Sequence, residues 1–130
     1  MENNVKIIIC IGSNYEQVSH VKKAKKMLLD KFPSIVFSPE LWTKPIGMES
    51  DDFLNLLAVT NTQLPLGEVE ATLKEIENEC GRKVFDKANG VVKIDLDILM
   101  YDRLRLHERD WQRMYIKKLL ALPLFEGILG

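Results

Sequence analysis

The sequence predicts an α+β fold of the ferredoxin-like type, with an antiparallel sheet, two helices on one face and a C-terminal helix. Two observations favour this class. Apolar, β-branched runs alternate with segments of helical periodicity in the order strand, helix, strand, strand, helix, strand. The chain has 130 residues, of which 46% are hydrophobic, so we expect one domain, residues 1–130, with a single core.

The first half of the chain supplies a strand, a helix and a second strand. Residues 5–11 are a short apolar run that predicts a strand, and residues 13–32 carry apolar side chains at helical spacing. Ser13 and Glu16 have the spacing of a capping box, in which each side chain accepts a hydrogen bond from a free backbone N–H of the first turn. Residues 35–43 predict the second strand.

A long loop and a second strand–helix pair occupy the middle of the chain. Residues 44–52 are rich in breakers, and loops of this length in a compact domain often carry function. Residues 53–62 predict a strand that is apolar on both faces. Pro65 then begins a helix that continues to residue 80, and Gly81 is placed to end it as a C-cap.

The C-terminal third contains one more strand and one more helix. Residues 82–90 are polar and lead into an apolar strand at residues 93–100. A basic stretch, residues 103–109, follows. Asp110 is then placed to cap a helix that ends before Pro123, with apolar side chains at helical spacing: Trp111, Met114, Tyr115, Leu119 and Leu122.

Composition excludes several functional classes. The formal net charge is −1 and the pI is about 6.1, so the protein has no overall attraction for nucleic acid or acidic membranes. The two cysteines, Cys10 and Cys80, lack the spacing of a zinc site and indicate buried thiols in a reducing compartment. The longest apolar run is too short for a membrane span, and we expect a soluble, cytoplasmic protein.

Asp95 and Asp97 are the most informative candidate site. On a strand, residues two apart share one face and their β-carbons are about 6.6 Å apart, which lets two carboxylates hold the same divalent cations. Ile94, Leu96 and Ile98 then face the core. The pattern alone is also typical of any half-solvated strand.

Other polar residues have both structural and functional interpretations. Asn55 lies in an otherwise apolar strand, where its amide either pairs with backbone or binds a planar heterocycle that stacks on Phe53. Arg82 follows a helix end, where a cation is favoured in any protein. The dense basic set could be solvated surface or could face phosphate: Arg103, Arg105, Arg109, Arg113, Lys117 and Lys118. Neither His20 nor His107 suggests a histidine-rich metal site.

The chain resembles the 6-hydroxymethyl-7,8-dihydropterin pyrophosphokinase family almost from end to end. Six short motifs, in order, carry the resemblance: residues 11–14, 43–47, 53–55, Ile76-Glu77 with Gly81-Arg82, 94–98 and 123–126. The resemblance implies transfer of a diphosphate from ATP to the hydroxymethyl group of a dihydropterin in folate biosynthesis, with release of AMP.

The resemblance also implies roles for individual residues. Asp95 and Asp97 match the aspartates that bind two Mg²⁺ ions, and together with Arg82 they would be catalytic. The pterin pocket would contain Thr43, Pro45, Ile46, Phe53, Asn55 and Leu119. The nucleotide side would contain Glu77, Arg82, Ile98 and Lys117. ATP and the pterin are the expected partners, without nucleic acid or membrane.

The chain departs from the family around the loop that precedes the aspartates. Two phosphate-facing arginines and a tryptophan of that loop are absent, and Leu119 stands where the family has its second pterin-stacking aromatic residue. Strand parity would place Lys93 beside Asp95 and Asp97, either replacing a lost arginine or pairing with the carboxylates. A catalytically weak or inactive paralogue that binds pterin or nucleotide is therefore the alternative function, and an interaction module is a third.

Overall fold

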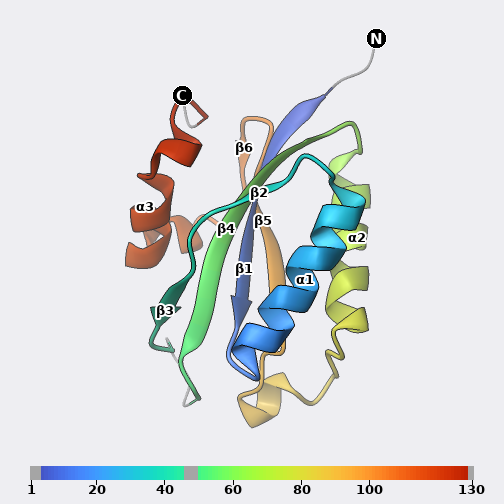
Figure 1. Ribbon diagram of the computed structural model, residues 1–130, viewed down its shortest axis with the longest axis vertical. Helices are drawn as coiled ribbons and strands as arrows, with labels where there is room; N and C mark the ends of the chain where they lie inside the picture. Colours follow the sequence, from blue (N-terminus) through green and yellow to red (C-terminus); the bar gives the residue numbers. More distant parts are fainter. Residues whose placement is uncertain (1–3, 46–49, 129–130) are drawn as a thin grey trace.

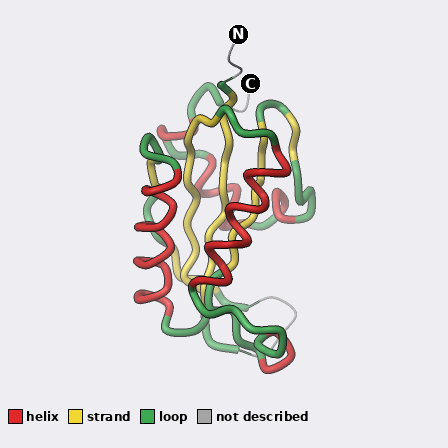
Figure 2. Tube along the Cα trace, turned by 90° about the vertical axis from the view of Figure 1, so that its right-hand side faces the viewer, coloured by secondary structure: helices red, strands yellow, loops and turns green. Residues whose placement is uncertain are grey.

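A single antiparallel sheet lies between two helical layers (Figure 1). The computed structural model describes residues 4–45 and 50–128. Helices α1 (Gln17–Lys31) and α2 (Leu66–Glu79) cover one face, and both lie in front of the strands in Figure 2. Helix α3 (Met114–Leu120) covers part of the opposite face. The predicted α+β class is confirmed.

The sheet has six strands in the order β2-β4-β1-β5-β6, with β3 also paired to β4. Every pairing is antiparallel. The order places β1 between β4 and β5, as the ferredoxin-like arrangement requires. The strands are β1 (Val5–Ser13), β2 (Val36–Phe37), β3 (Leu41–Thr43), β4 (Phe53–Thr62), β5 (Asp95–Tyr101) and β6 (Leu104–Arg105).

Alternation along β1 divides the interior into two cores. Ile7, Ile9 and Ile11 pack under α1 and α2. Ile8 and Cys10 face the other way and pack with residues of α3 and the C-terminal segment. A strand buried on both faces reads as a continuous apolar run, which explains the sequence of β1.

Helix α2 follows its prediction closely. It begins after Pro65, and Gly81, just beyond its end, has φ of +92°, a conformation that glycine adopts without a Cβ penalty. Val69, Leu73 and Ile76 form its buried stripe. None of the helices in the described part of the chain is long and apolar enough to cross a bilayer.

The predicted capping box at the start of α1 is wrong. Ser13 is the last, buried residue of β1, because β1 extends to pair with Leu54 of β4. Its hydroxyl donates to the Tyr15 carbonyl instead of capping the helix. Glu16 occupies the cap position in a left-handed conformation without a side-chain cap bond.

The strand predicted at residues 35–43 is divided into β2 and β3. Ser38 and Pro39 lie in the break, where proline supplies no N–H to a ladder. The Ser38 hydroxyl accepts a hydrogen bond from the Leu57 N–H at 2.9 Å, so the neighbouring strand remains satisfied across the break.

The C-terminal helix is shorter than predicted. A 3₁₀ turn, Asp110–Gln112, is separated from α3 by Arg113, whose backbone is extended. Met114 is therefore 80% exposed instead of packed, and Pro123 begins a further 3₁₀ turn. The basic stretch before it contains β6, which pairs with β5 and was not predicted.

The packing of α3 gives a stability prediction with an internal control. Ile116 is fully buried, so Ile116→Ala should lower the free energy of unfolding by about 2–5 kcal/mol through lost transfer energy and a residual cavity. Met114→Ala, two residues earlier and exposed, should change it by less than about 0.5 kcal/mol. Urea denaturation of both variants measures the difference. Equal effects would show that α3 does not pack as described.

Candidate active site

The strand register brings the candidate residues together in one row across the sheet. Gly12 of β1 pairs with Asn55 of β4 on one side and with Asp95 of β5 on the other. In the adjacent row, Cys10 pairs with Asp97. Because α3 covers only part of this face, the row containing Gly12 remains open to a pocket.

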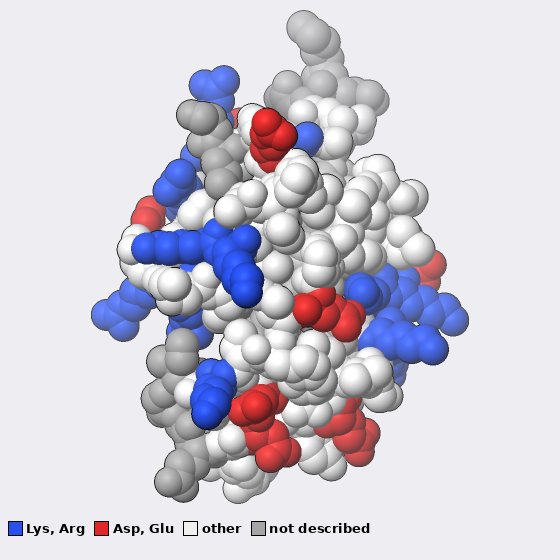
Figure 3. Space-filling view, turned by 60° about the vertical axis from the view of Figure 1, so that its left-hand side comes forward, with Lys and Arg blue, Asp and Glu red and all other residues white. Residues whose placement is uncertain are grey.

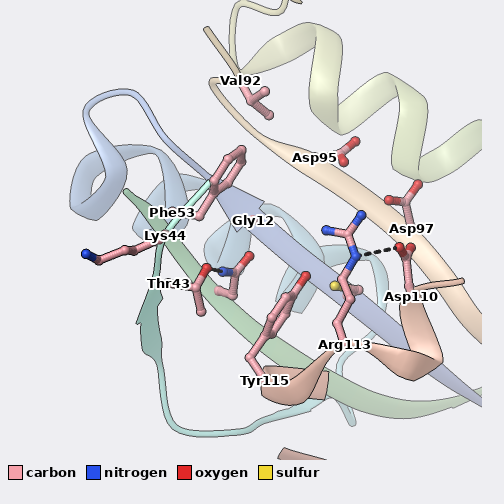
Figure 4. A pocket seen from close by; sticks show the side chains of 12 residues that line it. Gly12, Thr43, Lys44, Phe53, Val92, Asp95, Asp97, Asp110, Arg113 and Tyr115 are labelled. Carbon is pink, nitrogen blue, oxygen red and sulfur yellow. Dashed lines mark hydrogen bonds and ion pairs between the residues drawn. The ribbon is translucent and has the colours of Figure 1, made fainter. Parts of the chain in front are cut away.

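The two aspartates share a face, as their spacing predicts. Leu96 and Ile98 are buried in the core beneath α2, whereas Asp95 and Asp97 both line the pocket on the other side of β5 (Figure 4). The Asp97 side chain is one-third exposed. The pleat of β5 therefore fixes both carboxylates at one edge of the same cavity.

Negative charge on this face is only partly balanced. Burial, and then the nearby charge of Asp95, raises the pKa of Asp97 to about 7. Arg82 Nη1 lies 3.6 Å from Asp95 Oδ1, and His107 Nε2 lies 3.9 Å from Asp97 Oδ1. His107, given no site role from sequence, is thus one of the groups that face the pair.

Glu77 supports this arrangement from beneath. One of its oxygens lies 2.8 Å from Arg82 Nη1, and the other accepts the Leu96 N–H at 2.8 Å. The residue is buried, and burial raises the pKa of its carboxyl, although the Leu96 bond and the Arg82 charge act in the opposite direction. Glu77 links the backbone between the aspartates to the neighbouring arginine.

The pocket itself has a volume of about 280 Å³. Asn55 is 96% buried at its floor and donates to the Thr43 hydroxyl at 2.6 Å, so a side-chain hydroxyl satisfies one of its donors. A Cβ at Gly12 would lie 2.8 Å from Asn55 Oδ1, so this close approach requires glycine. The pocket is lined by Cys10, Gly12, Thr43, Lys44, Phe53, Asn55, Val92, Asp95, Asp97, Asp110, Arg113 and Tyr115.

Tyr115, and not Leu119, supplies the second aromatic ring. Leu119 is buried against the sheet and does not line the pocket. Tyr115, one helical turn earlier, projects into the pocket together with Phe53 (Figure 4). Helix α3 begins at Met114, later than predicted, after the 3₁₀ turn that ends at Gln112. Helical spacing at i and i−4 would have identified Tyr115 as the alternative.

Arg113 is a further residue that sequence reasoning did not assign to the site. Its side chain reaches across the pocket toward the acidic side, and its Nε lies 3.2 Å from Asp110 Oδ1 (Figure 4). Arg113 therefore adds a guanidinium to the lining of the pocket. The signal for Arg113 was its place in the basic set, which sequence alone could not orient.

The remaining predicted site residues are distributed as follows. Ile98 lines a cavity of about 300 Å³ with Glu77, Arg82 and His107. Lys117 does not line the cavities around the aspartates but a separate groove between β3 and α3. Pro45 is described but does not line the pocket, which Lys44 contacts instead. Ile46 lies outside the described residues.

Lys93 does not pair with Asp95 or Asp97, and it lines a cavity together with Arg82. Its Nζ donates to the Gly81 carbonyl at 2.8 Å and lies 3.4 Å from Asp86 Oδ2. Strand parity failed because Lys93 precedes the first residue of β5 and lies in a bend. The carboxylates of Asp95 and Asp97 consequently remain free of a lysine partner among the described contacts.

The donor set fits Mg²⁺ held jointly with a phosphate ligand. No group of three or more His, Cys, Asp or Glu side chains in residues 4–45 and 50–128 forms a complete metal cage. Mg²⁺ characteristically uses one or two carboxylates and completes its octahedron with water and phosphate oxygens. Two neighbouring carboxylates that share one face of the strand match that pattern.

A nucleophilic cysteine is not part of this site. Burial raises the pKa of both the Cys10 thiol and the Tyr115 hydroxyl. Both are therefore neutral at physiological pH, and a thiolate is needed for nucleophilic attack.

The surface on the α3 side carries mixed charge. Basic side chains form separate groups at the sides of this face, with acidic side chains between and below them (Figure 3). A continuous basic surface, as nucleic-acid binding requires, does not cover this face.

Comparison with known proteins decides the family. A sequence model of 7,8-dihydro-6-hydroxymethylpterin-pyrophosphokinase matches residues 8–124. The chain belongs to this pyrophosphokinase family.

Relatives of this family member include both short and long proteins. The 2-amino-4-hydroxy-6-hydroxymethyldihydropteridine pyrophosphokinase of Haemophilus influenzae is 32% identical over 130 residues, covering 91% of this chain and 78% of that protein. The folate synthesis bifunctional protein of Arabidopsis thaliana is 30% identical over 121 residues, 85% of this chain and 25% of its own length. A mitochondrial counterpart from Pisum sativum is also 30% identical, with 85% and 23% covered. The chain thus spans about a quarter of the plant proteins.

The raised pKa of Asp97 in this pyrophosphokinase-family chain gives a pH-dependent stability prediction. Below the ordinary value of 3.8 the group is protonated in both states; between 3.8 and about 7 only the folded state keeps the proton, so stability falls as pH rises. Asp97→Asn removes this penalty. Without divalent cations it should raise the free energy of unfolding at pH 8 by about 1–2 kcal/mol, after allowing for solvent screening, and by nothing below pH ~4.

Denaturant titrations at the two pH values measure this effect. Asp51→Asn, which alters an exposed carboxylate, should change stability by less than about 0.5 kcal/mol at either pH. An Asp97→Asn variant that is destabilised at pH 8 would contradict the described electrostatics.

Proposed function

We propose that the protein transfers the terminal diphosphate of ATP to the hydroxymethyl group of 6-hydroxymethyl-7,8-dihydropterin in folate biosynthesis, releasing AMP. One observation carries the proposal. Asp95 lines the heterocycle-sized pocket and also two adjoining cavities of about 400 and 300 Å³ that contain Arg82. A carboxylate at the junction of these spaces is suited to a reaction between two bound substrates.

The pocket supports binding of a pterin ring. Phe53 and Tyr115 offer aromatic surfaces, and the buried Asn55 amide offers polar atoms beside them. The Thr43 hydroxyl holds the Asn55 amide in a defined orientation. Aromatic surfaces beside oriented polar groups are typical of sites that select a planar heterocycle.

The adjoining cavity of about 400 Å³ supports binding of the nucleotide phosphates. Lys74, Arg82, Lys83 and Lys93 contribute positive charge to its lining, against Glu77, Asp86 and Asp95. Glu77 and Ile98 would border the nucleotide side through the neighbouring cavity. Cations at a polyphosphate stabilise the charge that shifts toward the leaving group during transfer.

Asp95 and Asp97 would hold Mg²⁺, and we propose two ions, shared with the nucleotide. Bound Mg²⁺ supplies charge neutralisation and polarises phosphoryl oxygens. Asp97 must give up its proton to act as a ligand, so cation affinity should increase as pH rises through about 7.

The chain's own residues would orient the reactants. The hydroxymethyl oxygen forms a bond to the β-phosphorus, the bond from that phosphorus to the oxygen of the α-phosphate breaks, and the hydroxyl proton passes to water. Glu77 holds Arg82 beside Asp95, and Arg113, just before α3, lines the pocket on the other side of Asp95. Positioning and charge neutralisation account for nearly all catalysis of phosphoryl transfer.

A second candidate is a weak or inactive paralogue that binds pterin or nucleotide. Residues 83–92 contain no arginine, and an arginine at a transferring phosphoryl group is worth about a thousandfold or more in rate.

The small-molecule substrates, ATP and the pterin, are the proposed partners. The two unpaired buried cysteines support a reducing, cytoplasmic location.

The proposed reaction is tested with purified protein, ATP, Mg²⁺ and hydroxymethyl-dihydropterin. AMP and the pterin diphosphate should appear together in equal amounts. Asp95→Asn and Asp97→Asn should each lower kcat by about a hundredfold or more, because each removes a cation ligand. Chromatographic quantification of AMP measures this. No AMP above background at high enzyme concentration, with both ligands bound, would favour the paralogue.

The assignment of Tyr115 to the pterin pocket is tested by calorimetry. Tyr115→Ala should weaken pterin binding by about tenfold, because stacking and apolar contact are lost, whereas Tyr115→Phe should retain most of the affinity. Leu119→Val, a change within the core, should leave the affinity of the folded protein within about twofold. A loss with Leu119→Val and not with Tyr115→Ala would reverse the assignment.

A further inference from the structure

The ammonium of Lys93 ties the end of α2 to the loop that follows it. Its Nζ donates to the Gly81 carbonyl at 2.8 Å and lies 3.4 Å from Asp86 Oδ2. The lysine side chain is 19% exposed. A largely buried ammonium needs close oxygen partners, and both partners here belong to the protein itself.

Asp86 extends this tie to the first turn of the loop. The same Oδ2 accepts the Lys83 N–H at 2.8 Å. This bond, and then the charge of Lys93, holds the pKa of Asp86 below its ordinary value. One carboxylate oxygen therefore joins Lys93 to the backbone directly after Arg82.

The other end of the loop is held by Asn14. Its Nδ2 donates to the Gly90 carbonyl at 2.9 Å, and its Oδ1 accepts the Val92 N–H at 2.6 Å. The Asn14 N–H also donates to the Val92 carbonyl at 2.9 Å. Residues 82–92 are thus fastened at both ends, with Lys93 holding the end that carries Arg82.

The end of the loop next to Gly81 sets the backbone position from which the Arg82 side chain extends. The Arg82 side chain is 42% exposed, so packing alone does not fix it, yet its Nη1 lies 2.8 Å from Glu77 and 3.6 Å from Asp95. The backbone before it turns at Gly81, whose carbonyl is the one that Lys93 binds.

We propose that Lys93 is a positioning residue for the reaction: by joining the Gly81 carbonyl to Asp86 it sets the backbone from which Arg82 reaches the carboxylate pair. The proposal rests on the proposed function for the role of Arg82. Because Lys93 binds the Gly81 carbonyl and Asp86, it leaves Asp95 and Asp97 free to bind cations.

Hydrogen exchange tests the tie independently of activity. The Asn89 and Val91 N–H groups donate to the Asp86 carbonyl at 3.0 and 2.8 Å. Lys93→Met should accelerate exchange of these two amides by about tenfold or more, while β1 amides remain protected. Lys93→Arg should restore protection, because a guanidinium can donate to both oxygens. Lys22→Met, which removes an exposed charge from α1, should change nothing.

Kinetics test whether Lys93 acts through Arg82. Lys93→Met should lower kcat by about tenfold while KM for the pterin changes less than about twofold, because the pterin pocket lacks Lys93. Lys93→Arg should recover most of kcat. In an Arg82→Met background, Lys93→Met should cost less than about twofold more, because the group it positions is already gone.

Two results would overturn the proposal. One is unchanged exchange of the Asn89 and Val91 amides in Lys93→Met. The other is a full tenfold loss from Lys93→Met in the Arg82→Met background, which would mean that Lys93 acts on substrate directly. If the wild-type protein makes no AMP, the proposed function fails, and the exchange experiment then decides the tie by itself.

Discussion

The site depends on one constraint, the pleat of β5. Leu96 and Ile98 are committed to the core beneath α2, so Asp95 and Asp97 must both face the open side of the sheet. Antiparallel register with β1 and β4 then sets Gly12 and Asn55 in the same row as Asp95. The pocket, the charged cavities beside it and their shared carboxylate all follow from this arrangement.

The same constraint has an electrostatic cost. Burial of a carboxylate on this partly covered face, and then repulsion by the neighbouring Asp95, raises the pKa of Asp97 to about 7. Neighbouring cations compensate only in part: Arg82 is shared with Glu77, and Lys93 is engaged elsewhere. Proteins commonly retain such unfavourable local arrangements where a ligand relieves them. In this site the ligand would be a divalent cation carrying a polyphosphate.

Much of the fold was predictable because the relevant signals are local. The long strand β4, the start of α2 after Pro65 and the glycine at its end follow from periodicity and backbone chemistry. The shared face of Asp95 and Asp97 follows from strand alternation. These features depend on residues close together in the chain.

The features that were predicted wrongly from the sequence depend on tertiary contacts. Pairing with β4 made Ser13 a strand residue, and packing of α3 on the sheet buries Leu119 and leaves Tyr115 at the pocket. The position of Lys93 was predicted wrongly because strand alternation was extended to Lys93, which lies in a bend before β5.

The central claim is that Asp95 and Asp97 jointly bind divalent cations beneath a nucleotide polyphosphate. It is tested most directly by a crystal structure with Mg²⁺, a non-hydrolysable ATP analogue and the pterin. The account predicts cation density in contact with both carboxylates and with phosphate oxygens; a bound analogue whose phosphates lie away from carboxylates that hold no cation would contradict it.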